Sequence, residues 1–172
     1  MKEKTHSECV IIGGGIIGLA IAAKLAKQGL AVIVLEAEKQ TIQHASSHNS
    51  EVIHSGIYYK SGSLKAKLCV EGNRLLYSYC QKKGVDFKRI GKLIIANDLS
   101  EKDSLDKLFQ NGIKNGVNGL TILDKNEITN REPNLNAKYA IFSETTGIID
   151  SHAFALSLEA EIESSDGHII ID

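Results

Sequence analysis

The sequence has no excess of charge of one sign. Lys and Arg number 20 against 21 Asp and Glu, so the formal net charge is -1. Nucleic acids and anionic lipids are attracted by strongly basic surfaces, which this balance does not favour. We therefore expect a small-molecule partner and no nucleic acid.

Cysteine is scarce and is not spaced in pairs. Cys9, Cys69 and Cys80 are odd in number and form no CxxC motif. They lie in patterns typical of strands or helices, where free thiols pack as small apolar side chains. The pattern favours a reducing compartment, and we expect a cytoplasmic protein.

The sequence also lacks a long hydrophobic run, an internal repeat and a low-complexity tract. The apolar run from Val10 to Ala23 is shorter than the roughly 18 to 20 residues of a membrane span. A secretory signal is the competing interpretation, because Lys2 and Lys4 precede this run. Acidic residues interrupt the basic region, however, and three adjacent glycines suit a turn better. Peripheral contact with the inner membrane stays open.

The chain has enough apolar residues to form a core. With 172 residues and 42% hydrophobic residues, it is expected to fold as one domain or as one domain and part of a second. Its start reads as strand, helix, strand: residues 8–12 are apolar and β-branched, residues 16–27 are helix-forming, and residues 31–35 form a second buried strand. Such a crossover between parallel strands is right-handed by default.

A glycine-rich motif separates the first strand from the helix. Gly13, Gly15 and Gly18 form GxGxxG, and Glu36 follows the second strand. These glycines permit a tight turn, close approach of a pyrophosphate and close packing of helix on strand. The helix N-terminus attracts phosphate, and the acid suits a ribose 2'-hydroxyl rather than a 2'-phosphate. The motif predicts FAD or NAD binding, although a glycine-rich turn that binds nothing remains the structural alternative.

The remaining elements follow from periodicity and capping signals. We expect an irregular segment over residues 41–59, helices over 63–83, 100–115 and 152–164, a brief helix after Asp124, and strands over 93–96, 120–123, 139–142 and 168–171. In the second helix, the apolar face is expected to comprise Leu64, Leu68, Leu75, Leu76 and Tyr79. In the third helix it is expected to comprise Leu105, Leu108 and Phe109, with Ser100 as the cap.

Three stretches resemble one family closely. The segment HNSEVIHSGIYY at residues 48–59, the helix start SLKAKLC at 63–69 and the strand GKLIIA at 91–96 are similar to the L-2-hydroxyglutarate dehydrogenase branch of the D-amino-acid-oxidase-like flavoproteins. A further similar feature is TGIID at residues 146–150. The resemblance covers nearly the whole chain. It implies an α/β fold, an FAD-binding Rossmann-like domain with part of an inserted α+β substrate domain.

The resemblance also implies positions for the cofactor and the substrate. Residues expected to bind FAD are Gly13, Gly15, Ile16, Gly18, Glu36, Ala37, Ser46, Ser47, His48, Asn49 and Ser50. His54, Ser55 and Gly56 would approach the reactive face of the flavin, and Tyr58, Tyr59 and Lys60 would reach the substrate. The implied reaction oxidises L-2-hydroxyglutarate to 2-oxoglutarate, with electrons passing through FAD to a quinone, another acceptor or dioxygen.

His54 is the candidate catalytic residue. An imidazole titrates near neutral pH, so it can accept the hydroxyl proton while a hydride leaves the substrate carbon. A histidine that tunes the flavin, or one that only stabilises the loop, is the alternative. Metal ligation by His44, His48 and His54 is not expected, because no carboxylate or thiol completes a ligand set.

Several other residues carry two interpretations. Lys65 and Lys67 are possible anchors for a dicarboxylate, but lysines on an exposed helix are more often solvated. Arg74, Arg89 and Arg131 have the same ambiguity. Ser151 and His152 follow the TGIID feature, where an active-site contribution is one interpretation, but a helix cap explains Asp150 or Ser151 without any chemistry.

The expected domain organisation is incomplete for this family. Residues 1–88 would form the first part of the FAD-binding domain, residues 89–146 a partial substrate domain, and residues 147–172 the return to the first domain. Family members are about twice this length, in line with the usual size of two domains. We therefore expect a truncated or split enzyme that needs a second polypeptide. An NAD-dependent enzyme and a non-catalytic remnant or cofactor-binding module are the alternatives.

Overall fold

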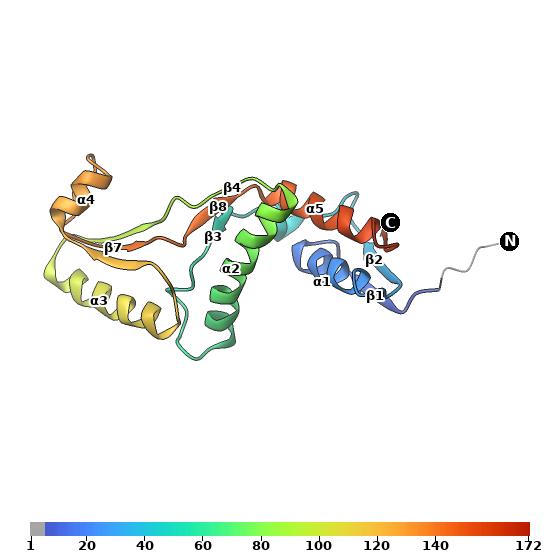
Figure 1. The fold of residues 1–172 in the computed structure, drawn as a ribbon, viewed down its shortest axis with the longest axis horizontal. Coiled ribbons are helices and arrows are strands. Elements are labelled where there is room, and N and C mark those ends of the chain that lie inside the picture. Colours follow the sequence, from blue (N-terminus) through green and yellow to red (C-terminus); the bar gives the residue numbers. More distant parts are fainter. Residues whose placement is uncertain (1–5) are drawn as a thin grey trace. The chain divides into compact units, whose positions relative to one another are not determined.

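The computed structural model describes residues 6–172, which divide into two compact units (Figure 1). Unit 1 comprises residues 6–51 and 150–172, and unit 2 comprises residues 52–149. Unit 2 is thus inserted into unit 1, and its end lies close to the expected return at residue 147. Residues 52–88 belong to unit 2, whereas they were expected to be part of the flavin domain. That functional grouping stays a prediction.

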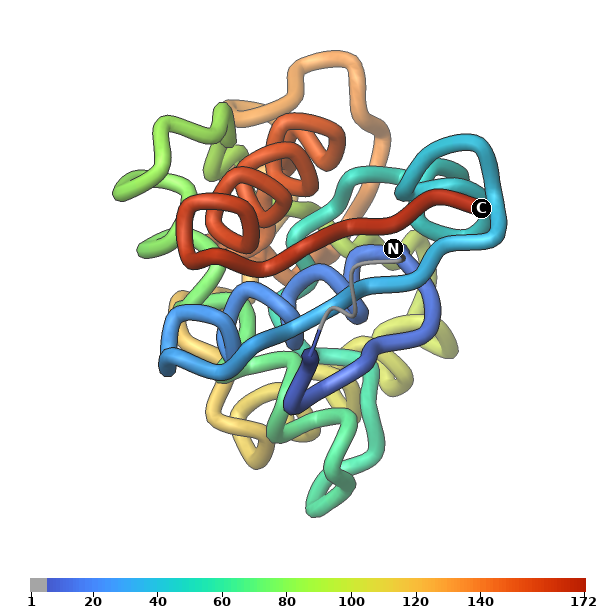
Figure 2. The backbone as a smooth tube through the Cα atoms, turned by 90° about the vertical axis from the view of Figure 1, so that its right-hand side faces the viewer, coloured from blue at the N-terminus to red at the C-terminus, as the bar shows by residue number. Residues whose placement is uncertain are grey.

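Unit 1 is a parallel sheet with helices. Its elements are β1 (Cys9–Ile12), α1 (Ile16–Ala26), β2 (Val32–Glu36), the 3-10 turn η1 (His44–Ser46), α5 (Ser151–Glu163) and β9 (His168–Ile171). The strand order is β1-β2-β9, and both pairings are parallel. The predicted strand-helix-strand unit is confirmed, and Figure 2 shows β2 between β1 and the red C-terminal strand β9.

One face of this sheet is covered and the other is not. Helices α1 and α5 contact each other, and small residues at Ala22, Ala23 and Ala26 permit the close packing. On β2, Val32 and Val34 are fully buried, whereas the side chains that alternate with them point to the opposite face. On that face Val10 and Ile12 are exposed, Ile12 to 88%. Unit 1 therefore presents an apolar sheet face.

Unit 2 contains two small antiparallel sheets and three helices. Its elements are β3 (Val52–Ile53), α2 (Leu64–Lys83), β4 (Phe87–Lys88), β5 (Leu93–Ala96), α3 (Leu99–Lys114), β6 (Leu120–Leu123), α4 (Lys125–Arg131), β7 (Tyr139–Ser143) and β8 (Gly147–Ile149). The strand orders are β3-β8-β4 and β5-β7-β6, and all pairings are antiparallel. The mixed α/β architecture agrees with the expected α+β insertion.

The core of unit 2 lies between α3 and the β5-β7-β6 sheet. Ile57, Leu105 and Ile141 are buried there, and Leu108 and Phe109 pack against them. The predicted apolar face of this helix is therefore confirmed. A second cluster forms around Ile128 of α4. Both clusters rest on β7, the central strand of the sheet.

The predicted apolar face of α2 is wrong. Leu64, Leu68 and Leu75 are exposed, whereas Ala66, Tyr77 and Cys80 are buried. Which face of α2 is buried depends on contacts with residues that are distant in the sequence. The Tyr77 hydroxyl donates to the carbonyl oxygen of Thr145 at 3.1 Å, and its ring lies 5.3 Å from that of Phe87. Leucine periodicity indicates an apolar face but does not identify what covers it.

The predicted helices α2 and α4 are confirmed, and the predicted capping residue of α3 is wrong. Ser63 caps α2, Gly84 ends it in the left-handed conformation, and Asp124 begins α4 with a capping box. The cap of α3 is Asp98 rather than Ser100, because the Asp98 carboxylate accepts from the Glu101 N–H at 2.9 Å. Strands β3, β4 and β8 were not predicted, since two or three residues are too few to show a period.

Further details agree with the expected strands and helices. All three cysteines are free, with Cys9 in β1 and the others in α2. The run from Val10 to Ala23 forms the end of β1, the glycine turn and most of α1, whereas Lys2 and Lys4 lie outside the described residues. Within residues 6–172, each helix is too short or too polar to span a bilayer.

Gly147 in β8 permits a close contact that explains its place in the TGIID feature. A Cβ atom here would lie 2.2 Å from the Tyr77 hydroxyl and 2.5 Å from the Lys88 carbonyl oxygen.

We predict that Gly147→Ala lowers the free energy of unfolding by about 1–3 kcal/mol through overpacking. The matched control is Gly72→Ala in α2, where the added Cβ meets no atom within 4 Å. That variant should be more stable by about 0.5–1 kcal/mol. Urea unfolding of both variants tests this pair, and equal midpoints would contradict it.

Candidate functional site

The glycine motif forms a tight turn between β1 and α1. Gly13 ends the strand with φ +103°, a conformation that other residues rarely adopt. Gly15 is the N-cap of α1. A Cβ on Gly18 would lie 2.1 Å from the carbonyl oxygen of Gly13. Only glycine at this position lets the first turn of α1 approach the end of β1 so closely.

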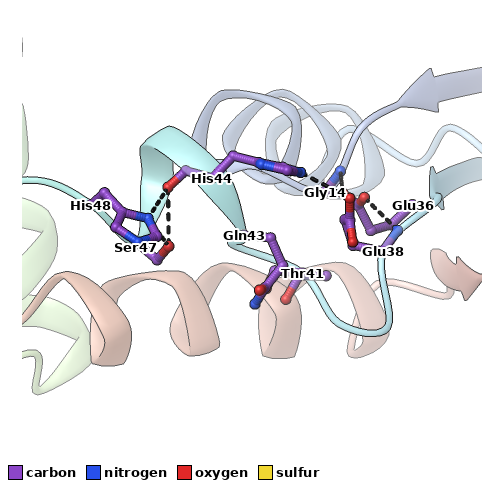
Figure 3. A network of polar contacts seen from close by, with 8 residues as sticks. All are labelled: Gly14, Glu36, Glu38, Thr41, Gln43, His44, Ser47 and His48. Atoms are coloured by element: carbon purple, nitrogen blue, oxygen red, sulfur yellow. Dashed lines mark hydrogen bonds and ion pairs between the residues drawn. The ribbon is translucent and has the colours of Figure 1, made fainter.

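Glu36 at the end of β2 is bonded to this turn (Figure 3). One carboxylate oxygen accepts from the Gly14 N–H at 2.6 Å and the other from the Glu38 N–H at 2.9 Å. These two bonds lower the pKa of Glu36 below 4.5, and the bond from Glu38 has a larger effect than the bond from Gly14. The group is therefore ionised at neutral pH. Each oxygen retains a lone pair for a ribose hydroxyl.

A hollow of about 650 Å³ opens beside the turn, within unit 1. The predicted residues that line it are Gly13, Gly15, Ile16, Gly18, Ser46 and Asn49. The N-terminal turn of α1 has N–H groups without carbonyl partners in the helix, and these favour a bound anion. Isoleucines of β1 and α1 form much of the remaining lining, so the α1 N-terminus and Ser46 are the part of the hollow that suits a phosphate group.

The segment after β2 is irregular and carries backbone strain. Ile42, His44 and Glu51 have positive φ values of 58°, 57° and 55°, which is uncommon for residues other than glycine. The Ile42 N–H donates to the Gly14 carbonyl oxygen at 3.0 Å, which ties this segment to the turn. The Ser46 hydroxyl accepts from the Ile16 N–H at 3.1 Å. Strain of this kind gathers at functional segments.

The other residues predicted for the cofactor lie outside this hollow. His48 is exposed, and its Nδ1 lies 2.8 Å from the His44 carbonyl oxygen and 2.9 Å from the Ser47 hydroxyl (Figure 3). Ser50 and Ala37 are exposed as well. Contact of these four residues with the cofactor stays a prediction.

The structure adds residues that the predicted set lacks. Ser151, at the start of α5, lines the hollow, and its hydroxyl and N–H both donate to Glu51 Oε1 at 2.7 and 3.1 Å. Thr41 bonds Glu159 of α5 through its hydroxyl. The cap signal at Asp150 places a helix terminus here, but only the fold brings that terminus beside the glycine turn.

The expected substrate segment lies in unit 2. Ser55 and Gly56 are buried, and the Ser55 hydroxyl accepts from Ser143 at 3.0 Å. His54 and Tyr58 are exposed, and they flank the buried residues 55–57. Asn73 Nδ2 donates to the His54 carbonyl oxygen at 3.0 Å, which holds the backbone and leaves the ring accessible. Two effects lower the pKa of His54 below 6.5. The larger is the loss of hydration on burial, and the smaller is the positive charge of Lys92.

Two asparagines anchor the same segment, Asn111 in α3 and Asn115 at the C-cap of that helix. Asn111 Nδ2 donates to the carbonyl oxygens of Ile57 and Tyr59 at 2.7 and 2.8 Å. Asn115 Nδ2 donates to those of Gly56 and Tyr59 at 3.0 and 2.8 Å. Asparagine is a weak helix former, so two asparagines four residues apart were a signal that sequence reasoning missed.

The cations considered in the sequence have separate surroundings. Arg89 lies over the Tyr77 ring at 4.3 Å and Arg131 over Phe142 at 4.2 Å. Lys65 Nζ lies 4.6 Å from the centroid of Tyr59. Lys67 lines a shallow hollow near the start of α2, and Arg74 is exposed. Lys92, which the sequence analysis did not select, lies over Tyr58 at 4.6 Å.

The histidines near the glycine turn were not expected to bind a metal, and the structure gives them protein contacts. His44 Nε2 lies 2.9 Å from Glu38 Oε1. Across residues 6–172, the structure shows no group of three potential ligands from His, Cys, Asp and Glu. The donors at the glycine turn, in contrast, are backbone N–H groups, hydroxyls and one carboxylate. This set matches a phosphate and a ribose better than a metal ion.

Comparison with known proteins gives close relatives. The chain is 46% identical over 165 residues to the mitochondrial L-2-hydroxyglutarate dehydrogenases of Pongo abelii and Homo sapiens. The match covers 95% of this chain but 39% and 36% of those proteins. The chain thus spans little more than a third of the length of these curated relatives.

Solved structures share the fold. The L-alpha-glycerophosphate oxidase of Mycoplasma pneumoniae, solved with FAD bound, has a TM-score of 0.91 and 29% identity over 98% of this chain and 45% of its own. The L-proline dehydrogenase of P. horikoshii has a TM-score of 0.85 at 22% identity, with the same coverage.

The family model for FAD dependent oxidoreductases, named DAO, matches residues 8–172. This match includes the glycine turn, Glu36 and the segment from His54 to Lys60. Together with the fold and the relatives, it shows that the chain belongs to the DAO family of FAD-dependent oxidoreductases.

Proposed function

We propose that the protein oxidises L-2-hydroxyglutarate to 2-oxoglutarate with FAD as the hydride acceptor, and that this chain supplies the first part of both binding sites. The observation that carries the proposal is the 46% identity to L-2-hydroxyglutarate dehydrogenases over 95% of the chain. The glycine turn and Glu36 support the FAD part. The His54 segment supports the substrate part.

Unit 1 provides the groups that would hold the cofactor. The α1 N-terminus and Ser46 suit the pyrophosphate, and Glu36 suits the ribose. The family resemblance implies that the next residues would line the flavin, namely Ser47, His48, Asn49 and Ser50. Ile16 and Ala37 would contact the cofactor through their backbone next to the turn and the acid.

His54 is the proposed proton acceptor. A ring nitrogen takes the proton of the 2-hydroxyl group while the hydrogen on C2 leaves as a hydride, and a C=O bond forms between C2 and its oxygen. FAD supplies an acceptor for that hydride when it is bound. Because the pKa of His54 is lowered, its ring is neutral and able to accept a proton at pH 7. Tyr58, Tyr59 and Lys60 would contact the substrate.

A second polypeptide is proposed to supply further parts of the sites. The sheet face with Val10 and Ile12 is apolar and exposed, and on α1 Ile17 is exposed to 74%. Within the described residues β1 pairs only with β2, so its other edge is available to a strand. Parallel sheets are normally covered on both faces, which supports an apolar partner here. We also propose a cytoplasmic location, with peripheral contact at the inner membrane as the alternative, whereas the relatives are named as mitochondrial.

An absorbance experiment tests the proposed function. The chain is incubated with FAD, free cofactor is removed, and L-2-hydroxyglutarate is added without oxygen, alone and with a polypeptide corresponding to the remaining part of the human relative. We expect a retained flavin spectrum that bleaches with the substrate and not with D-2-hydroxyglutarate. Retention without bleaching in both mixtures would contradict the oxidation, and no retention would favour a non-catalytic remnant.

Glu36 should be needed for FAD affinity. Hydrogen bonds to a charged group contribute about 1.5–3 kcal/mol, so Glu36→Gln should weaken FAD binding by about tenfold or more. The control is Glu38→Gln, whose carboxylate contacts His44 instead. That variant should bind FAD within about twofold of the native chain. Quenching of flavin fluorescence measures both, and native affinity in Glu36→Gln would exclude the assigned role.

The pH dependence of the reaction should report His54. Because protonated His54 cannot accept a proton, kcat/KM of the FAD-loaded protein should fall as the pH drops, with a midpoint below 6.5. His54→Gln should remove this limb and lower kcat by about 10²–10⁴-fold. His168→Gln on β9 should retain it. A native acid limb in His54→Gln would assign the proton transfer to another group.

A further inference from the structure

We propose that Lys92 binds a carboxylate group of the substrate beside His54 and Tyr58, and that it is thereby a specificity-determining residue for an acidic substrate. This inference rests on the proposed function. It concerns unit 2 alone. Lys92 was not among the residues that the sequence analysis assigned to the site.

Lys92 is held at a defined position by its backbone. It immediately precedes β5, and it exchanges two backbone hydrogen bonds with Ser143 at the end of β7, at 3.1 and 2.8 Å. The Gly91 N–H donates to the Thr146 carbonyl oxygen at 2.9 Å. Ser143 also bonds Ser55, next to His54. The sheet therefore places the base of this lysine next to the His54 segment.

The side chain of Lys92 lies against the same segment. Its Nζ is 4.6 Å from the centroid of the Tyr58 ring. A cation over an aromatic face retains N–H donors for an anion, since the ring uses the charge and not a directed bond. In the described part of the chain, Lys92 has no carboxylate within ion-pair distance. It is therefore a half-buried cation that can bind an anion.

Lys92 supplies the charge that acts on His54. Lys92 lowers the pKa of His54, and the groups of α2 near the His54 backbone, the Asn73 amide and the Cys69 thiol, are neutral at pH 7. A carboxylate bound to Lys92 would offset that positive charge. The pKa of His54 would then rise towards 6.5, so His54 becomes a stronger base when the acidic substrate is present.

Lys65 is a control of closely similar geometry. Its Nζ is also 4.6 Å from a tyrosine centroid, that of Tyr59. Its charge lowers the pKa of Cys69 and has no resolved effect on His54. Lys92 and Lys65 therefore have the same type of contact but different titrating neighbours. Removing each charge separately tests whether position matters.

The first test is a histidine titration of the full chain by NMR. The chain has 6 histidines, and His54→Gln assigns the resonance of His54. We expect Lys92→Met to raise the pKa of His54, Lys92→Arg to retain the native value, and Lys65→Met to leave it unchanged. Circular dichroism of each variant checks that unit 2 is folded. A native His54 titration in Lys92→Met would overturn the proposal.

The second test adds glutarate, a dicarboxylate that has no hydroxyl group to oxidise. Glutarate should raise the pKa of His54 in the native chain and in Lys65→Met, and its affinity should fall about tenfold or more in Lys92→Met. Equal affinity in the native chain and Lys92→Met, or no effect of glutarate on the native chain, would overturn the proposal. Glutarate binding through Lys92 in a chain that does not oxidise L-2-hydroxyglutarate would reject the proposed function alone.

Discussion

The close approach of α1 to the end of β1 is the contact on which the candidate cofactor site depends. Gly18 lies so near the Gly13 carbonyl oxygen that no side chain fits between them. This contact positions the first turn of α1, and the Gly14 N–H next to it is bonded by Glu36 at the end of β2. These contacts hold the strand, the turn, the helix and the acid in one fixed arrangement. The hollow beside the turn follows from that arrangement.

A different principle holds the segment from His54 to Lys60 in unit 2. This segment has little regular structure, and its shape is maintained by side chains from elsewhere. Asn111 of α3 and Asn115 at its C-cap donate to three of its carbonyl oxygens, and Asn73 of α2 donates to a fourth. Because these amides satisfy the hydrogen-bonding capacity of the backbone carbonyl oxygens, the segment can be partly buried while His54 and Tyr58 remain accessible.

Chemistry and specificity are assigned to separate features of the chain. The glycine turn suits a dinucleotide, and the proton transfer that we propose for His54 would be the same for any 2-hydroxy acid. A cation next to the base would distinguish among these acids, because it favours substrates with an additional carboxylate. The uncovered apolar face of unit 1 is a further consequence of the same fold, since a parallel sheet with helices on one side needs a partner on the other.

The sequence by itself determined the elements whose signals are local. The GxGxxG spacing, the leucine spacing after Ser63 and the closing Gly84 depend on residues close together in the chain, and α1, α2 and the parallel pair β1-β2 were predicted from such signals. The family was also accessible from sequence, because HNSEVIHSGIYY and GKLIIA are specific stretches. The tertiary structure decided what distant residues meet. It chose Ala66, Tyr77 and Cys80 as the buried face of α2, formed β8 by pairing with β3 and β4, placed Ser151 at the glycine turn, and brought Lys92 to Tyr58. These contacts join residues up to a hundred or more positions apart, so no short window of sequence contains the information that selects them.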